Sequence, residues 1–156
     1  MNKSRHLEVL IESVRDKCDF LAEANNTLDG KAATLMGFEI TLGIGYASLV
    51  LGNVGGTNHD EGVAGLFMLG MSVASLLYVN WPRDYTTTCV DLFEHTEYLE
   101  KGTGDLLLQL TSDAQNAFSQ NNQKLKTKAR FYKAAIVLLL VATFLFLMSK
   151  SPNFYV

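Results

Sequence analysis

Three apolar runs constrain the fold of this chain more than any other feature of its sequence. They occupy residues 32–51, 63–81 and 134–148. Each approaches the roughly 20 residues that a helix needs to cross about 30 Å of hydrocarbon. The runs are apolar on nearly every side, whereas helices of a soluble bundle, the alternative fold, would keep a polar face. The sequence therefore predicts an all-α integral membrane protein with three transmembrane helices and additional cytoplasmic helices.

Basic residues next to these runs predict the orientation of the chain. Cytoplasmic segments of membrane proteins carry an excess of Lys and Arg. The segment before the first run and the region between the second and third runs are rich in both, whereas the loop 52–62 has neither. We therefore expect the N-terminus in the cytoplasm and the C-terminus on the periplasmic or extracellular side.

The same pattern divides the chain into five segments. Residues 1–30 are expected to form an amphipathic cytoplasmic helix, and 32–51 and 63–81 the first two transmembrane helices. A cytoplasmic helical region at 82–130 and a third transmembrane helix at 131–149 should follow. The first segment does not read as a signal peptide, because its charges alternate and it lacks an apolar centre.

The N-terminal helix carries an apolar residue at every seventh position, namely Leu7, Val14, Leu21 and Leu28. A heptad stripe of this kind needs a partner to cover it. The two candidates are the other cytoplasmic helix and the same helix of another subunit.

Within the 82–130 region, Pro82 and Arg83 are expected to end the second span. A helix at 89–101 and a turn at 102–104 should follow, and from Asp105 an amphipathic helix should continue into the third span without a break. Its inward side chains are expected to be Leu106, Leu107, Leu110, Ala114 and Phe118.

The first run carries one acidic residue, Glu39, among the glycines Gly37, Gly43 and Gly45. Small residues four positions apart let helices approach closely in lipid. An intramembrane carboxyl faces the interior of a bundle or an aqueous path by default. Two arrangements stay open: a ring of Glu39 side chains around the axis of an oligomer, which would favour cations, or a protonated Glu39 bonded to Asn80 or to a Ser or Thr of the second span.

Neither catalysis nor a resident cofactor is expected. The chain has no P-loop, no CxxC pair and no HExxH motif, and no nucleophile stands with a base and an orienting group. Asp91 and His95 share a helical face, but two ligands do not make a metal site. The basic run before the third span, which includes Lys126 and Arg130, should contact anionic lipid headgroups or bind an anionic ligand such as a nucleotide.

The junction Asp29–Gly30–Lys31–Ala32, leading directly into the first span, resembles the Pycsar effector family of bacterial anti-phage membrane proteins. The order of segments is similar as well: an N-terminal helix, two spans, a Pro–Arg step, a helical cytoplasmic region, and a basic run into a last span. The related SLATT-type effectors share this design. We expect no separate cyclic-nucleotide-binding domain, because these segments leave no room for one and no motif of one is found.

The resemblance implies a defence effector that forms homo-oligomers in the bacterial inner membrane and disrupts it when triggered. The trigger would be a cyclic pyrimidine nucleotide or a separate protein, and no nucleic acid polymer is expected as a partner. The residues expected to sense the signal are Asp29, Lys31, Arg83, Lys126 and Arg130. The alternatives are a constitutive membrane adaptor that recruits a cytoplasmic partner and a regulated cation channel outside defence.

Overall fold

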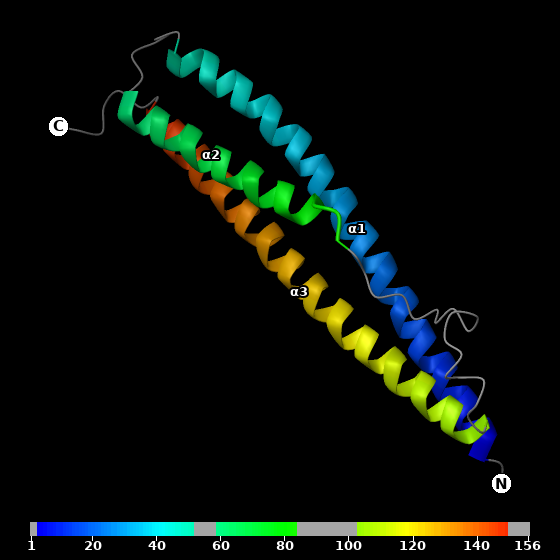
Figure 1. The fold of residues 1–156 in the computed structure, drawn as a ribbon. Helices are drawn as coiled ribbons and strands as arrows, with labels where there is room; N and C mark the ends of the chain where they lie inside the picture. The colour runs from blue at the N-terminus through cyan, green and yellow to red at the C-terminus, as the bar shows by residue number, and fades with distance from the viewer. Residues whose placement is uncertain (1–2, 52–58, 84–102, 150–156) are drawn as a thin grey trace. The chain divides into compact units, whose positions relative to one another are not determined.

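The computed structural model describes residues 3–51, 59–83 and 103–149, and within these ranges the secondary structure is helical without any strand. Helix α1 covers Lys3–Leu51, α2 covers His59–Asn80 and α3 covers Thr103–Ser149 (Figure 1). The predicted all-α fold class is therefore confirmed. The helix expected at 89–101, with Asp91 and His95, lies outside the described residues.

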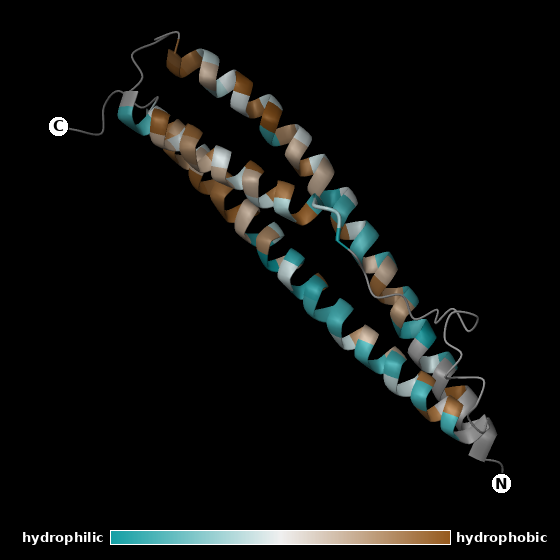
Figure 2. Ribbon diagram, in the orientation of Figure 1, coloured by the Kyte–Doolittle hydropathy of each residue, from teal (hydrophilic) through white to brown (hydrophobic). Residues whose placement is uncertain are grey.

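Each of the three helices contains a stretch that is long and apolar enough to cross a membrane. In Figure 2 the apolar residues gather in the C-terminal part of α1, along α2 and in the C-terminal part of α3, while polar residues are interspersed with apolar ones in the rest of α1 and α3 that is coloured. By length and composition, the chain is that of a multi-pass membrane protein.

The helix bounds differ from the predicted ones at two of the three spans. The N-terminal helix and the first span are one continuous helix, which passes through Gly30 without a break. Helix α2 begins at His59, four residues early, and places Asp60 and Glu61 in its first turn, where acidic groups suit the helix dipole. The predicted continuity of the amphipathic helix into the third span is confirmed, since α3 runs unbroken from Thr103.

The chain packs as two units, which we call the polar unit and the apolar unit. The polar unit comprises Met1–Thr27 and Arg83–Lys126, and the apolar unit comprises Leu28–Pro82 and Thr127–Val156.

In the polar unit, the predicted leucine stripe is buried at Leu21, while Leu7 and Val14 have side chains outside the described set. On α3, Phe118 and the other described residues expected inward are only half-buried. The buried positions of α3 in this unit are instead Thr111, Ala117 and Asn121. The polar side chains of Thr111 and Asn121 can be buried in this unit because both have interaction partners.

The apolar unit is a bundle of three helices in which α2 runs antiparallel to α1 and α3 (Figure 1). Its core consists of Ala32, Leu76, Val79 and Ala135. The alanines of α1 and α3 let the helix backbones approach closely, which is the main source of packing energy where no water is expelled. Helix α2 is the most enclosed of the three helices. In its most apolar stretch of 18 residues 33% of the residues are buried, against 11% in the corresponding stretches of α1 and α3.

Buried positions of the apolar unit recur with a heptad spacing. On α2 they alternate by three and four residues: Gly62, Gly65, Leu69, Ser72, Leu76 and Val79. On α3 they recur every seven residues, at Lys128, Ala135, Ala142 and Ser149. On α1, Ala32 and Glu39 are one heptad apart. This period is typical of left-handed helix packing at a small crossing angle, which is common in membrane bundles.

Aromatic pairs join the helices at two levels of the bundle. The rings of Tyr46 and Phe146 stack, with centroids 3.9 Å apart and an interplanar angle of 11°. The rings of Tyr78 and Phe131, at the opposite end, have centroids 4.0 Å apart and a tilt of 43°. Trp81 is 68% exposed, as expected for a side chain at a lipid headgroup boundary.

Replacing Gly65 by Leu should separate α2 from α3. A Cβ atom at Gly65 would lie 3.3 Å from the backbone oxygen of Ala142, which cannot move aside, whereas a Cβ at Gly70 would meet nothing within 4 Å. We expect Gly65→Leu to lower the free energy of unfolding in detergent micelles by about 1–3 kcal/mol relative to Gly70→Leu. Equal stability of the two variants would contradict this packing.

Candidate functional site

Glu39, the carboxyl that the sequence places among hydrocarbon, is fully buried inside the apolar unit. The hydroxyl oxygen of Ser72 on α2 lies 2.7 Å from Glu39 Oε1. The same hydroxyl lies 2.7 Å from the backbone carbonyl oxygen of Ala135 on α3. These three groups, which we call the polar node, connect all three helices at one level of the bundle.

Ser72 behaves differently from the other hydroxyl residues of the helices. Thr34, Thr41, Ser75 and Thr143 each donate to the carbonyl four residues earlier in their own helix. That local bond satisfies a hydroxyl in an apolar environment without any partner helix. The hydroxyl of Ser72 instead lies between two other helices, so its position is a tertiary contact.

One atom of the polar node and one atom outside it lack hydrogen-bond partners within the part of the chain that the structure describes. Glu39 Oε2 and the Asn80 Nδ2 amide nitrogen are both buried without a hydrogen-bond partner among the described residues. Of the partners predicted for a protonated Glu39, the structure therefore has a serine of the second span and not Asn80. Within one chain Glu39 faces the interior, so a ring of these side chains around a shared axis would require the bundle to open.

The glycines near Glu39 lie on two different sides of α1. Gly43 faces α2, and a Cβ atom there would lie 3.1 Å from Leu69 Cδ2. Gly37 and Gly45 are exposed, and a Cβ at either would meet nothing within 4 Å. The glycines of the first span therefore do not lie on one face of α1: Gly43 belongs to the interior, and Gly37 and Gly45 belong to an outer surface.

Asp29, part of the junction motif, pairs with a buried lysine. The ammonium nitrogen of Lys128 lies 2.8 Å from Asp29 Oδ1 and 3.0 Å from Oδ2. Lys128 is 2% exposed and Asp29 is 33% exposed. The carboxylate thus neutralises a charge that would be costly to bury alone, and it fixes α1 against α3 where the apolar unit begins.

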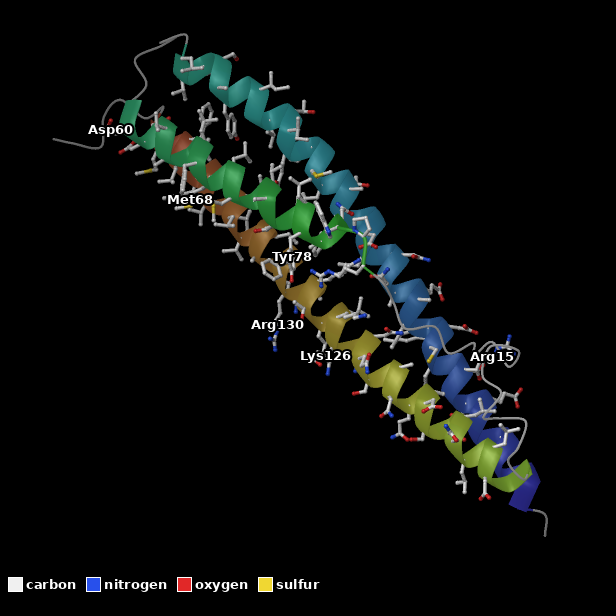
Figure 3. The ribbon with its side chains drawn as sticks, viewed as in Figure 1. Arg15, Asp60, Met68, Tyr78, Lys126 and Arg130 are labelled. Carbon is white, nitrogen blue, oxygen red and sulfur yellow. The ribbon has the colours of Figure 1, made fainter. Side chains whose placement is uncertain are left out.

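The other residues expected to sense a signal do not converge on this ion pair. Lys31, Lys126 and Arg130 are exposed, and Figure 3 shows Lys126 and Arg130 projecting outward from α3. Arg83 is half-buried and has a polar partner. Sequence reasoning anticipated a Ser or Thr of the second span without identifying Ser72, and it did not single out Lys128 within the basic run. The signal that would have found Lys128 is the heptad that runs through Ala135 along α3.

An open groove in the polar unit is one surface of the described residues that could accept a ligand away from the spans. It is lined by residues of α1, including Glu12, Asp16 and Lys17, and by Phe118 and Asn122 of α3. Two acidic side chains against one basic one make it a poor site for a nucleotide phosphate. No group of three metal-ligating side chains occurs among the described residues.

Comparisons of the chain with protein-family models, with curated proteins and with solved structures give no match. The fold and the site therefore define its class by themselves. It is a helical, multi-pass membrane protein whose three spans meet at a buried carboxyl.

Replacing Asp29 by Asn should destabilise the apolar unit, because buried Lys128 would lose the carboxylate it contacts. We expect the free energy of unfolding in micelles to fall by about 1–3 kcal/mol. Lys128→Met should cost less, because Asp29 is partly exposed and keeps access to water. The control is Lys126→Met, an exposed neighbour expected to change stability by less than about 0.5 kcal/mol. A cost for Asp29→Asn no larger than that of the control would contradict the ion pair.

Proposed function

We propose that this protein is an effector of bacterial anti-phage defence that oligomerises in the inner membrane and makes it leaky when a nucleotide or protein signal arrives. It acts without catalysis. The observation that carries the proposal is an unpaired small-residue surface on α1, which we call the outer stripe. It consists of Ala33, Gly37, Thr41 and Gly45, spaced four residues apart and all exposed.

The outer stripe has the properties of a helix–helix contact in lipid. At Gly37 and Gly45 the space next to the backbone is open, so a second helix could approach closely. The Thr41 hydroxyl donates to the Gly37 carbonyl 3.0 Å away, so the stripe exposes no unsatisfied hydroxyl to hydrocarbon. Repetition of this contact between copies would build a homo-oligomer around the first span.

The resemblance at the Asp29–Lys31 junction supports the defence role. In the families that share it, the spans respond to a signal received on the cytoplasmic side. Within the apolar unit, Lys31 and Arg130 offer exposed positive charge next to the spans, which suits an anionic ligand such as a cyclic pyrimidine nucleotide or an acidic protein surface.

Two other functions follow from the same architecture. A constitutive adaptor would use the polar unit to recruit a cytoplasmic partner, and its groove with Val9 and Phe20 exposed supports that reading. A regulated cation channel outside defence would share the oligomer and differ in its biological setting. A neighbouring gene for a nucleotide cyclase, reverse transcriptase or nuclease would favour defence, and a transport operon would favour the adaptor.

The proposal predicts that bacteria producing the protein together with its trigger lose their membrane potential, as read by a voltage-sensitive dye. Gly37→Leu and Gly45→Leu should weaken the leak and reduce the oligomer mass in detergent, because the bulky side chain fills the outer stripe. Gly70→Leu, at an exposed glycine of α2, is the matched control and should retain both. Full leakage and unchanged mass in the stripe variants would contradict the proposal.

Glu39→Gln and Glu39→Leu should also weaken the leak if opening of the polar node is part of activation. Full activity in both variants would remove Glu39 from the mechanism while leaving the oligomer proposal intact. The mass of the purified protein with and without cyclic pyrimidine nucleotides separates the two triggers: a nucleotide-dependent change favours a nucleotide, and an absence of binding favours a protein.

A further inference from the structure

We propose that the polar node is a proton-binding site: Glu39 holds a proton as a neutral carboxylic acid and donates it in a hydrogen bond to Ser72. This assignment does not depend on the proposed function. It follows from counting the hydrogen atoms available to the two short contacts of the node.

The contact between Ser72 and Ala135 fixes the serine hydrogen. Two oxygen atoms 2.7 Å apart are at the usual O–H···O distance and would repel each other without a hydrogen between them. A backbone carbonyl oxygen has no hydrogen to give, whereas a serine hydroxyl has one. The Ser72 hydroxyl therefore donates to the Ala135 carbonyl.

The contact between Ser72 and Glu39 then needs a hydrogen from the other side. It is also 2.7 Å long, and the single serine hydrogen is already used. Sharing that hydrogen between two acceptors would lengthen both contacts, and both are short. Ser72 retains two lone pairs and so accepts. The remaining source is the Glu39 carboxyl, which must carry the proton on Oε1.

The surroundings of Glu39 Oε2 lead to the same assignment. This oxygen is buried and has no partner among the described residues. In a neutral acid it is a carbonyl oxygen, and leaving it unbonded costs far less than leaving part of a charged carboxylate unbonded in hydrocarbon.

No described cation compensates a negative charge at Glu39. Lys128 is a buried cation of α3, one heptad before Ala135 of the node. Its ammonium group contacts Asp29 at the end of the apolar unit, and not Glu39. The titratable side chains of the described spans around the node are Tyr46 on α1, Tyr78 on α2, and Tyr132 and Lys133 on α3. Lys133 is exposed, and none of the four is bonded to Glu39. A proton therefore takes the place that a counter-ion would otherwise have.

The bound proton completes a chain of donors across the bundle, from Glu39 through Ser72 to Ala135. If the proton left, Glu39 and the Ala135 carbonyl would both be acceptors for one serine hydrogen, and a charge would stand in hydrocarbon. One of the two contacts would then break. The proton thus acts as a ligand that holds α1 against α2 and α3.

Infrared spectroscopy of the full-length protein in lipid at neutral pH tests this assignment. The wild-type protein should show the carbonyl stretch of a protonated carboxylic acid, with a shift in heavy water. Glu39→Gln, which preserves size and a donor group, should remove that band. Glu23→Gln, at an exposed glutamate of α1, should remove carboxylate bands only.

A second variant keeps the test informative if Glu39→Gln does not fold. Ser72→Ala retains the carboxyl and removes its acceptor, so the acid band should persist at a shifted frequency. Absence of an acid band from the wild-type protein, or loss of carboxylate bands alone in Glu39→Gln, would overturn the proposal. An acid band that Ser72→Ala leaves unshifted would overturn the bond to Ser72.

Discussion

The contact of Glu39 with Ser72 is the interaction on which the arrangement of the spans depends. A carboxyl group inside hydrocarbon must form its hydrogen bonds within the protein, because lipid tails offer no hydrogen-bond partners and water is absent there. Ser72 supplies that bond and also reaches the backbone of Ala135, so that one side chain from α2 brings α1 and α3 to a common level. The outward faces of α1 and α3 are then free to meet lipid or other copies.

The heptad period explains why these groups meet. On α2, Ser72 occupies a buried position of a three–four alternation that includes Gly65 and Val79. On α3, Ala135 and Lys128 are one heptad apart and both buried. The polar node and the Asp29–Lys128 pair are therefore two levels of one packing pattern. Both join α1 to α3, the node through α2 within the apolar region and the ion pair directly at its edge.

Much of this architecture could be predicted from the sequence, because length and hydropathy alone determine whether a helix suits a membrane. The three spans and the unbroken α3 were predictable for that reason. The partners of the polar side chains were not, because they depend on the rotation of each helix. Lys126, Lys128 and Arg130 look equivalent in sequence, yet packing buries Lys128 and leaves Lys126 and Arg130 exposed. Similarly, four glycines of α1 look alike, but Gly43 alone contacts α2.

A double-mutant cycle between Glu39→Met and Ser72→Ala tests most directly whether the spans are joined at the polar node. Unfolding free energies in micelles should give a coupling of about 0.5–2 kcal/mol, the range of hydrogen bonds between membrane helices. The control cycle pairs Glu39→Met with Ser75→Ala, because the Ser75 hydroxyl bonds to Met71 within its own helix; its coupling should be near zero. A Glu39–Ser72 coupling no larger than that of the control would contradict the account.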